Sequence, residues 1–230
     1  MMYAETRRLW AFFARDMQLA LSYPLDFALR LSMLAFQVFL IYFLSLLVGP
    51  KPELAEYGGY LPFVIVGMAT LSYFQSGFSS FSQALRREQM TGTLEAVLMT
   101  PTRIPSFLIG SAIWDYSWAT FTALLYLLAA SALYSVQLQG SILLALGLLI
   151  LLTLFFASLG IMSAAFVMIF KRGDPLGILV GSFSALLGGA FFPVEYLPAW
   201  LQKISAIIPL RYGLDGLRAI LLQGLPFSQI

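Results

Sequence analysis

The chain has 230 residues, of which 60% are hydrophobic and 10% are charged, whereas soluble domains have roughly 45–50% and about 25%. This composition excludes a water-soluble core and indicates one integral membrane domain over residues 1–230, because no long polar block remains for another domain. The chain has neither cysteine nor histidine, so disulfides, a metal site and catalysis are not expected. Its net charge of +2 does not favour nucleic acid binding.

Residues 1–22 are predicted to form an amphipathic helix at the membrane interface, with a basic stripe opposite an apolar arc. The residues that define the two faces are Arg7, Arg8 and Arg15 on one side and Trp10 and Phe13 on the other. The apolar face is expected to enter the headgroup boundary and the arginines to meet anionic lipid. Asp16 lies on the apolar side and needs a partner. The alternative is a helix that packs on the protein itself.

Two membrane spans are expected next, at 27–48 and 61–81. The first corresponds to roughly 33 Å of helix, enough to cross a bilayer. The second carries small polar residues, such as Ser76 and Ser79, that suit helix contacts or a moist cavity better than lipid.

Residues 86–105 are polar and lie between two apolar segments. Thr93 is a good N-cap, and Glu95 would place its charge in the positive first turn of a short helix. Pro101 forces Thr100 out of the helical region, so this helix should stop by Thr100. An ordinary polar loop is the alternative.

The same stretch resembles the cytoplasmic loop of the ABC-2 type permeases, the membrane subunits of ATP-driven exporters. The matching residues are Arg86, Arg87, Glu88, Gly92, Thr93, Leu94, Glu95, Leu98, Thr100 and Pro101. The resemblance implies an all-α, type V exporter-like helical bundle in which this loop couples to a separate ATPase subunit. It also implies a second permease copy, and contact between the helix at 1–22 and the ATPase.

A third span is expected at 106–134, with Asp115 well inside it. A carboxylate at that depth costs several kcal/mol, about 2.5 or more on insertion scales, so it is a functional candidate by default. Asp115 either lines a pathway or is a structural acid that stays protonated or hydrogen-bonded.

The fourth and fifth spans are expected at 141–170 and 176–192, separated by the basic turn at 171–175. Four small residues recur at four-residue spacing in the fifth span and predict a helix-packing ridge; they are Gly177, Gly181, Ala185 and Gly189. Most Lys and Arg residues fall on the side of the N-terminus and of this turn, while Arg218 falls on the other. The positive-inside rule therefore predicts a cytoplasmic N-terminus in a bacterial inner membrane.

Residues 193–210 are apolar but interrupted, which is typical of a re-entrant outer segment. The residues that mark it are Phe192, Pro193, Leu197, Pro198 and Pro209. It resembles the outer hairpin that precedes the sixth span of the ABC-2 permeases. The sequence stops before such a span, so five spans are expected here and truncation is favoured over a dispensable helix.

No G-x-x-x-x-G-K-[ST] motif occurs, because none of Lys51, Lys171 and Lys203 follows a glycine. The chain is therefore not expected to hydrolyse ATP, and ATP and Mg would be held by the partner subunit. We interpret it as the permease of an exporter for a drug-like, lipidic or other amphipathic substrate, in contact with membrane lipid. The alternatives are a haem-exporter-like biogenesis subunit, an ion-coupled secondary transporter that uses Asp115, and an intramembrane enzyme.

Overall fold

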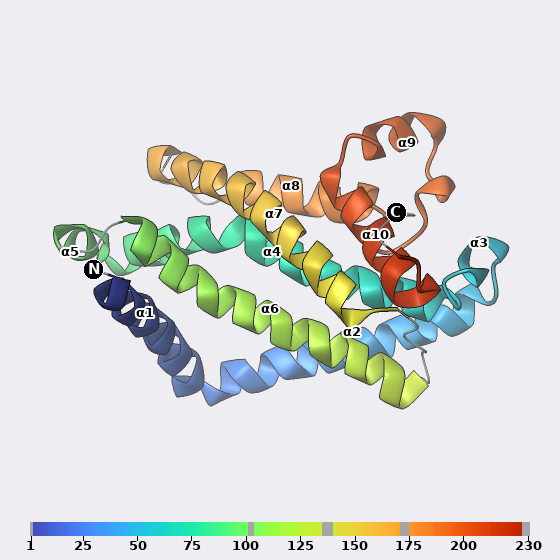
Figure 1. The fold of residues 1–230 in the computed structure, drawn as a ribbon, viewed down its shortest axis with the longest axis horizontal. Helices are drawn as coiled ribbons and strands as arrows, with labels where there is room; N and C mark the ends of the chain where they lie inside the picture. Colours follow the sequence, from blue (N-terminus) through green and yellow to red (C-terminus); the bar gives the residue numbers. More distant parts are fainter. Residues whose placement is uncertain (1, 101–103, 135–139, 171–174, 227–230) are drawn as a thin grey trace.

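The computed structural model describes residues 2–100, 104–134, 140–170 and 175–226, and all regular elements in these ranges are helical (Figure 1). In chain order they are α1 (Met2–Ser22), α2 (Pro24–Val48), α3 (Pro52–Ala55), α4 (Tyr60–Thr91), α5 (Leu94–Met99), α6 (Ile104–Tyr134), α7 (Ile142–Phe170), α8 (Pro175–Leu187), the 3-10 helix η1 (Val194–Tyr196), α9 (Ala199–Ser205) and α10 (Pro209–Gln223). Helix α5 and the N-terminus lie at one end of the long axis, and α3 and α9 lie toward the other (Figure 1). The all-α prediction is confirmed for the described residues.

Three helices of the described part, α2, α4 and α7, are long and apolar enough to cross a membrane by length and composition. Helix α6 has 31 residues, about 46 Å at 1.5 Å per residue, and carries Asp115 in its first half. Helices α2, α4, α6 and α7 contain or nearly contain the four spans expected from 27 to 170. The crossing by α6 stays a prediction.

The expected fifth span at 176–192 is wrong, because α8 has only 13 residues and ends at Leu187. Its length of about 20 Å is shorter than the roughly 30 Å hydrocarbon core. The chain turns after Leu187 through Gly189, whose φ of 81° lies in the left-handed region that favours glycine. The expected ridge therefore lacks Gly189 and consists of Gly177, Gly181 and Ala185. The basic turn at 171–174 lies outside the described residues.

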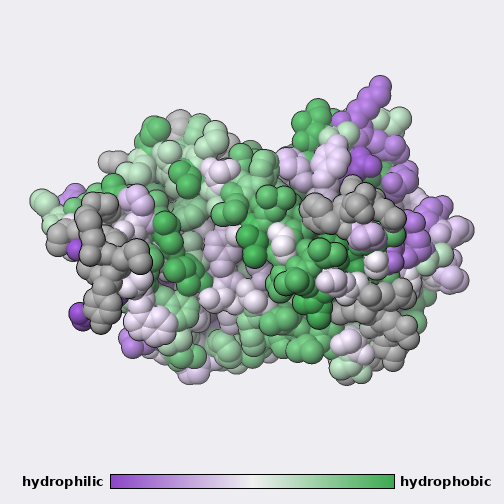
Figure 2. Space-filling model, viewed as in Figure 1, coloured by the Kyte–Doolittle hydropathy of each residue, from purple (hydrophilic) through white to green (hydrophobic). Residues whose placement is uncertain are grey.

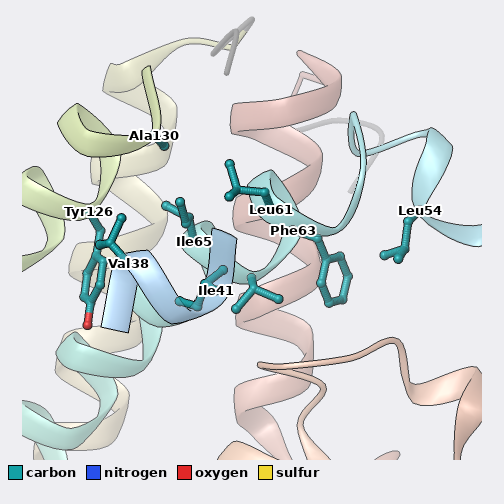
Figure 3. Close-up of a cluster of buried hydrophobic side chains, with 9 residues drawn as sticks. Val38, Ile41, Leu54, Leu61, Phe63, Ile65, Tyr126 and Ala130 are labelled. Carbon is teal, nitrogen blue, oxygen red and sulfur yellow. The ribbon is translucent and has the colours of Figure 1, made fainter. Parts of the chain in front are cut away.

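Helix α4 is the element on which most of the other helices pack. Residues of α4 occur in each of the four clusters of buried apolar side chains. The cluster drawn in Figure 3 joins its first turns to α2, α3 and α6, and the labelled members are Val38, Ile41, Leu54, Leu61, Phe63, Ile65, Tyr126 and Ala130. Further along the helix, Val66 packs with α7 and α10, and Phe81 packs with α6 and α7. Protein thus surrounds most of the apolar part of α4.

Helices α2 and α7, in contrast, leave most of their apolar side chains exposed. Figure 2 shows hydrophobic side chains across the middle of the visible face, while hydrophilic side chains gather mainly at the end that carries α3 and α9. An apolar middle with exposed helices is the surface expected where lipid, rather than water, surrounds the chain.

The backbones of α4 and α7 meet at two glycines. A Cβ atom on Gly160 would collide with the carbonyl oxygen of Gly77 and would lie 2.8 Å from that of Phe78. Close helix contact at small residues is the usual way in which membrane helices gain packing, because apolar lipid provides no hydrophobic drive for their association. The sequence predicted a small-residue ridge on α8 and did not predict this contact between α4 and α7.

The outer segment 193–210 contains η1 and α9, which are too short to cross a membrane. Leu197 ends η1, and Pro198 precedes the first residue of α9. Pro193 is buried and Phe192 is half-buried. Pro209 does not end a helix but begins α10, where its missing N–H is not needed.

Arg218 of α10 fixes the turn after α8 to the start of α4. Its side chain is 1% exposed, and its Nε donates to the Phe63 carbonyl oxygen at 3.2 Å. Its Nη2 donates to the carbonyl oxygens of Gly189 at 2.8 Å and Ala190 at 3.2 Å. The guanidinium also lies 3.4 Å from the centre of the Phe63 ring. Arg218 is thus buried and holds these segments together, a role that the sequence did not indicate, and its place on the outer side stays a prediction.

We predict that Gly160→Ala lowers the free energy of unfolding by about 1–3 kcal/mol, because the added methyl group meets backbone that cannot rotate away. Thermal unfolding in detergent, followed by size-exclusion chromatography, measures the effect. Gly147→Ala is the matched control in the same helix, since no atom lies within 4 Å of a Cβ built there. Equal melting temperatures for the two variants would contradict close packing of α4 on α7.

Candidate functional site

The C-terminal end of α4 turns sharply into α5. Gly92 has a φ of 72°, and its N–H donates to the Gln89 carbonyl oxygen at 3.3 Å. The N–H of Thr93 donates to the Glu88 carbonyl oxygen at 3.0 Å. These two bonds form a Schellman cap, which satisfies carbonyl groups that the end of a helix leaves free. The cap sets the direction in which α5 leaves α4.

The short helix predicted from Thr93 is present as α5, and Thr100 beyond it is extended, with φ −72° and ψ 156°. Pro101, to which we attributed this ending, lies outside the described residues. Two expectations are corrected. Residues 86–91 belong to the last turns of α4 rather than to a loop. The Thr93 side chain makes no capping bond to α5. Its backbone is helical, with φ −95° and ψ −4°, rather than extended as in an N-cap, and its hydroxyl donates a charge-assisted hydrogen bond to Glu88 Oε2.

Glu88 joins three helices. It is only 8% exposed, its Oε2 accepts from Thr93 at the start of α5, and its Oε1 accepts from Arg15 Nη1 of α1 at 2.8 Å. Arg15 also donates through Nε to Asp16 Oδ1 at 3.0 Å. A buried carboxylate needs such partners to remain charged. The arrangement ties α1, α4 and α5 into one unit.

Helix α1 packs partly on the protein, which was the alternative reading of residues 1–22. The ring of Phe12 meets Phe107 of α6 edge-on at 5.4 Å between centroids, and Phe13 lies 5.9 Å from Trp114. Arg15 contacts Asp16 and Glu88 rather than facing only lipid. Arg7 and Trp10 are exposed and Arg8 is half-buried, so contact between this part of α1 and lipid remains a prediction.

Helix α5 has one face that packs on the protein and an exposed outer face. Leu94 and Val97 pack against the apolar cluster of α4 and α6. Glu95 and Leu98 are exposed, and Met99 is 89% exposed. Helical spacing would allow Leu98 to share the apolar face of Leu94 and Val97, but the side chain is exposed. An apolar and acidic surface therefore projects from the end of the molecule.

A groove of about 930 Å³ runs between α4 and α8. It brings together two sets of residues that the sequence assigned to different roles. From α4 it is lined by residues that include Phe74, Phe78, Gln83, Arg86 and Arg87, and from α8 by Gly177, Gly181 and Ala185. The rings of Phe74 and Phe78 are stacked, with centroids 6.2 Å apart. The groove is therefore aromatic along part of its wall and basic along another part.

Asp115 does not line this groove. Its Oδ2 lies 3.8 Å from Arg87 Nη2, so the partner expected for a buried acid is an arginine of α4. Asp115 lines two further cavities of about 620 and 480 Å³, which share residues of α4 with the groove. Among the described residues, no group of three or more acidic side chains could hold a metal ion.

The sequence analysis did not foresee that Arg218 is buried or that Asp16 lines a cavity. The signal for Arg218 was its position four residues after Leu214 and three before Leu221, on the apolar side of α10. The signal for Asp16 was its place among apolar residues of α1. Gln83 carried no signal, and only the packing of α4 shows that it lines three cavities.

Comparison with known proteins matches residues 7–222 to the model of the ABC-2 type transporter family. The chain is 31% identical over 186 residues to Nodulation protein J of Rhizobium leguminosarum bv. trifolii, covering 80% of this chain and 71% of that protein. It is 30% identical over 165 residues to Nodulation protein J of Rhizobium meliloti (strain 1021), covering 71% and 62%. It is also 30% identical over 146 residues to the "Probable multidrug ABC transporter permease YbhR" of Escherichia coli (strain K12), covering 63% of this chain and 39% of YbhR.

These relatives are longer than the matched region, so the chain spans about two thirds of the nodulation proteins and two fifths of YbhR. Family members are transmembrane subunits that lack the ATPase domain and work with an ABC ATPase. The match covers nearly all of the chain and agrees with its all-helical fold, its apolar spans and the capped helix after Gly92. The chain belongs to the ABC-2 type transporter family of membrane permeases.

Proposed function

We propose that this permease exports an amphipathic, drug-like or lipidic substrate along the groove between α4 and α8, and that a separate ATPase subunit drives it by docking on α5. The observation that carries the proposal is the exposed outer face of α5, held rigidly at the end of the central helix. ATP and Mg would be held by the ATPase subunit. The sequence relationship to YbhR, whose name describes a probable multidrug permease, supports a drug-like substrate.

Movement of α5 would reach the membrane helices through two rigid connections. The Schellman cap fixes α5 to the end of α4, and Glu88 fixes both helices to Arg15 of α1. Coupling between a nucleotide site and a transport pathway needs elements that move together rather than bend. The unit of α1, α4 and α5 would therefore turn as one body when the ATPase changes shape.

The lining of the groove supports an amphipathic substrate. Arg86 and Arg87 supply positive charge near the inner end of α4, while Phe74 and Phe78 supply aromatic surface further along the helix. On α8, a Cβ atom built on Gly181 would meet no atom within 4 Å. We propose that a second permease copy closes the groove there, as the small ridge of Gly177, Gly181 and Ala185 would allow.

The distribution of charge supports an inner membrane location with the N-terminus in the cytoplasm. The arginines of α1 and of the last turns of α4 lie near the end of the molecule that carries α5 (Figure 1). Basic residues favour the cytoplasmic side of a membrane. This orientation would place α5 on the side where an ATPase finds its nucleotide.

We predict that Gly92→Pro abolishes substrate export while the ATPase subunit keeps its activity, because proline can adopt neither the φ of 72° nor the bond to Gln89. Glu95→Arg should act in the same direction by reversing the charge of the docking face. Export and ATP hydrolysis are measured together in proteoliposomes, with Glu195→Arg at the other end of the molecule as the control. Normal export by Gly92→Pro would refute α5 as the coupling element.

We expect Arg15→Gln and Glu88→Gln to be non-additive in export rate and in stability, since each removes the same ion pair. A double-mutant cycle should give a coupling free energy of about 1 kcal/mol or more, as found for groups in direct contact. Additive effects within about 0.3 kcal/mol would mean that the Arg15–Glu88 pair does not join α1 to α4 in the membrane.

Gly181→Leu should separate the two permease copies, because a large side chain would stand where the second copy approaches. Co-purification of two differently tagged chains measures assembly independently of export. Gly147→Leu on the exposed side of α7 is the control, since its Cβ also meets open space. Undiminished co-purification of Gly181→Leu would place the contact between copies elsewhere.

A further inference from the structure

A cavity of about 620 Å³ lies between α1, α2, α4 and α6, next to the groove, with which it shares Gln83 and Arg87 of α4. Its wall includes three carboxylates, Asp16, Asp26 and Asp115, and two guanidinium groups, Arg30 and Arg87. Its volume falls within the range of small-molecule sites, about 300–1,000 Å³. The transport proposal assigns it no role.

Asp16 provides the observation that points to a ligand. Its side chain is 3% exposed, and its Oδ1 accepts from Arg15. Its Oδ2 is buried and has no hydrogen-bond partner among the described residues. A buried carboxylate oxygen without a donor costs free energy, and Asp16, which carries this atom, is one of the residues that line the cavity.

The charges around the cavity are unevenly paired. Arg30 Nε donates to Asp26 Oδ2 at 2.7 Å, which satisfies that pair. Arg87 stands 3.8 Å from Asp115, beyond hydrogen-bond distance, and Arg15 divides its donors between Asp16 and Glu88. Asp16 and Asp115 also interact with each other electrostatically. The cavity wall therefore has room for one more positive charge with N–H donors.

The rest of the wall suits an organic cation rather than a metal ion. Trp114, Trp118 and Phe27 line the cavity, and the faces of such rings attract cations. The rings of Phe27 and Trp118 already meet edge-on at 5.6 Å, and Arg30 lies 6.0 Å from the Trp118 ring. Aromatic walls around a pair of carboxylates provide contacts for both ends of an amphipathic amine.

We propose that this cavity binds a primary organic ammonium group, which donates hydrogen bonds to Asp16 Oδ2 and to the carboxylate of Asp115 while its apolar part lies on the tryptophans. The site adjoins the α4–α8 groove through Gln83 and Arg87, and the proposal does not rest on the transport route. The ammonium group can come from a free amphipathic amine or from the ethanolamine headgroup of a phospholipid. Both share the N–H donors that the site requires.

The test uses the full chain in phosphatidylcholine nanodiscs, because the choline headgroup has no N–H donor. Dansylcadaverine, a fluorescent primary amine, is titrated in, and its neutral N-acetyl derivative corrects for partition into lipid. We expect saturable binding of the amine alone. Asp16→Asn and Asp115→Asn should each weaken it at least tenfold, whereas Glu195→Gln at the outer end should leave it unchanged. Asparagine keeps the shape of the side chain, and size-exclusion profiles identify any variant that fails to fold.

A second arm separates the two sources of the ammonium group. Nanodiscs with an increasing fraction of phosphatidylethanolamine should displace the probe if the headgroup occupies the cavity, and should leave its binding unchanged if the natural ligand is a free amine. Either result supports an ammonium site. The proposal is overturned if the acetylated probe binds as tightly as the amine, or if both asparagine variants bind the amine as the unmodified chain does.

Discussion

The close approach of neighbouring backbone to α4 is the constraint on which the rest of the structure depends. At Gly77 the backbone of α7 comes so near that its residue 160 must also be glycine, and at Gly67 a Cβ atom would meet the Ala190 carbonyl oxygen and the Arg218 guanidinium. Lipid is as apolar as leucine, so close packing replaces the hydrophobic effect as the force that joins these helices. Because neighbouring backbone packs so closely on α4, this helix forms a rigid connection between the turn after α8 and α5.

A buried charged side chain lies near each end of α4, and each of the two has specific partners. Near the N-terminal end of α4, Arg218 donates to three backbone carbonyl oxygens, and its guanidinium lies 3.8 Å from the carboxylate of Asp215. Burial lowers the pKa of Arg218 to about 10, which leaves it charged at neutral pH. Near the C-terminal end of α4, Glu88 accepts hydrogen bonds from Arg15 and Thr93. In a low dielectric an unpaired charge is costly, so these contacts restrict how α1, α5 and α10 can sit on α4.

The groove beside α8 and the cavity beside α1 and α6 differ in chemistry although they share residues of α4. The groove toward α8 contains arginines and phenylalanines and opens at small residues, whereas the cavity toward α1 and α6 contains aspartates and tryptophans. Arg87 and Gln83 line both.

The sequence alone determined the membrane class, the all-helical fold, the helix between Thr93 and Thr100 and the family, because these depend on composition, local capping and a contiguous motif. It also identified Asp115 as an acid in need of a partner. It could not show that α8 stops at Leu187, that Thr93 bonds Glu88 rather than capping α5, or that Arg218 is buried. The partners of the buried charges lie far apart in the chain: Arg218 is 155 residues from Phe63, and Glu88, which Thr93 bonds, is 73 residues from Arg15. Only tertiary structure decides such contacts, because local periodicity indicates which face of a helix is apolar but not which neighbour that face will meet.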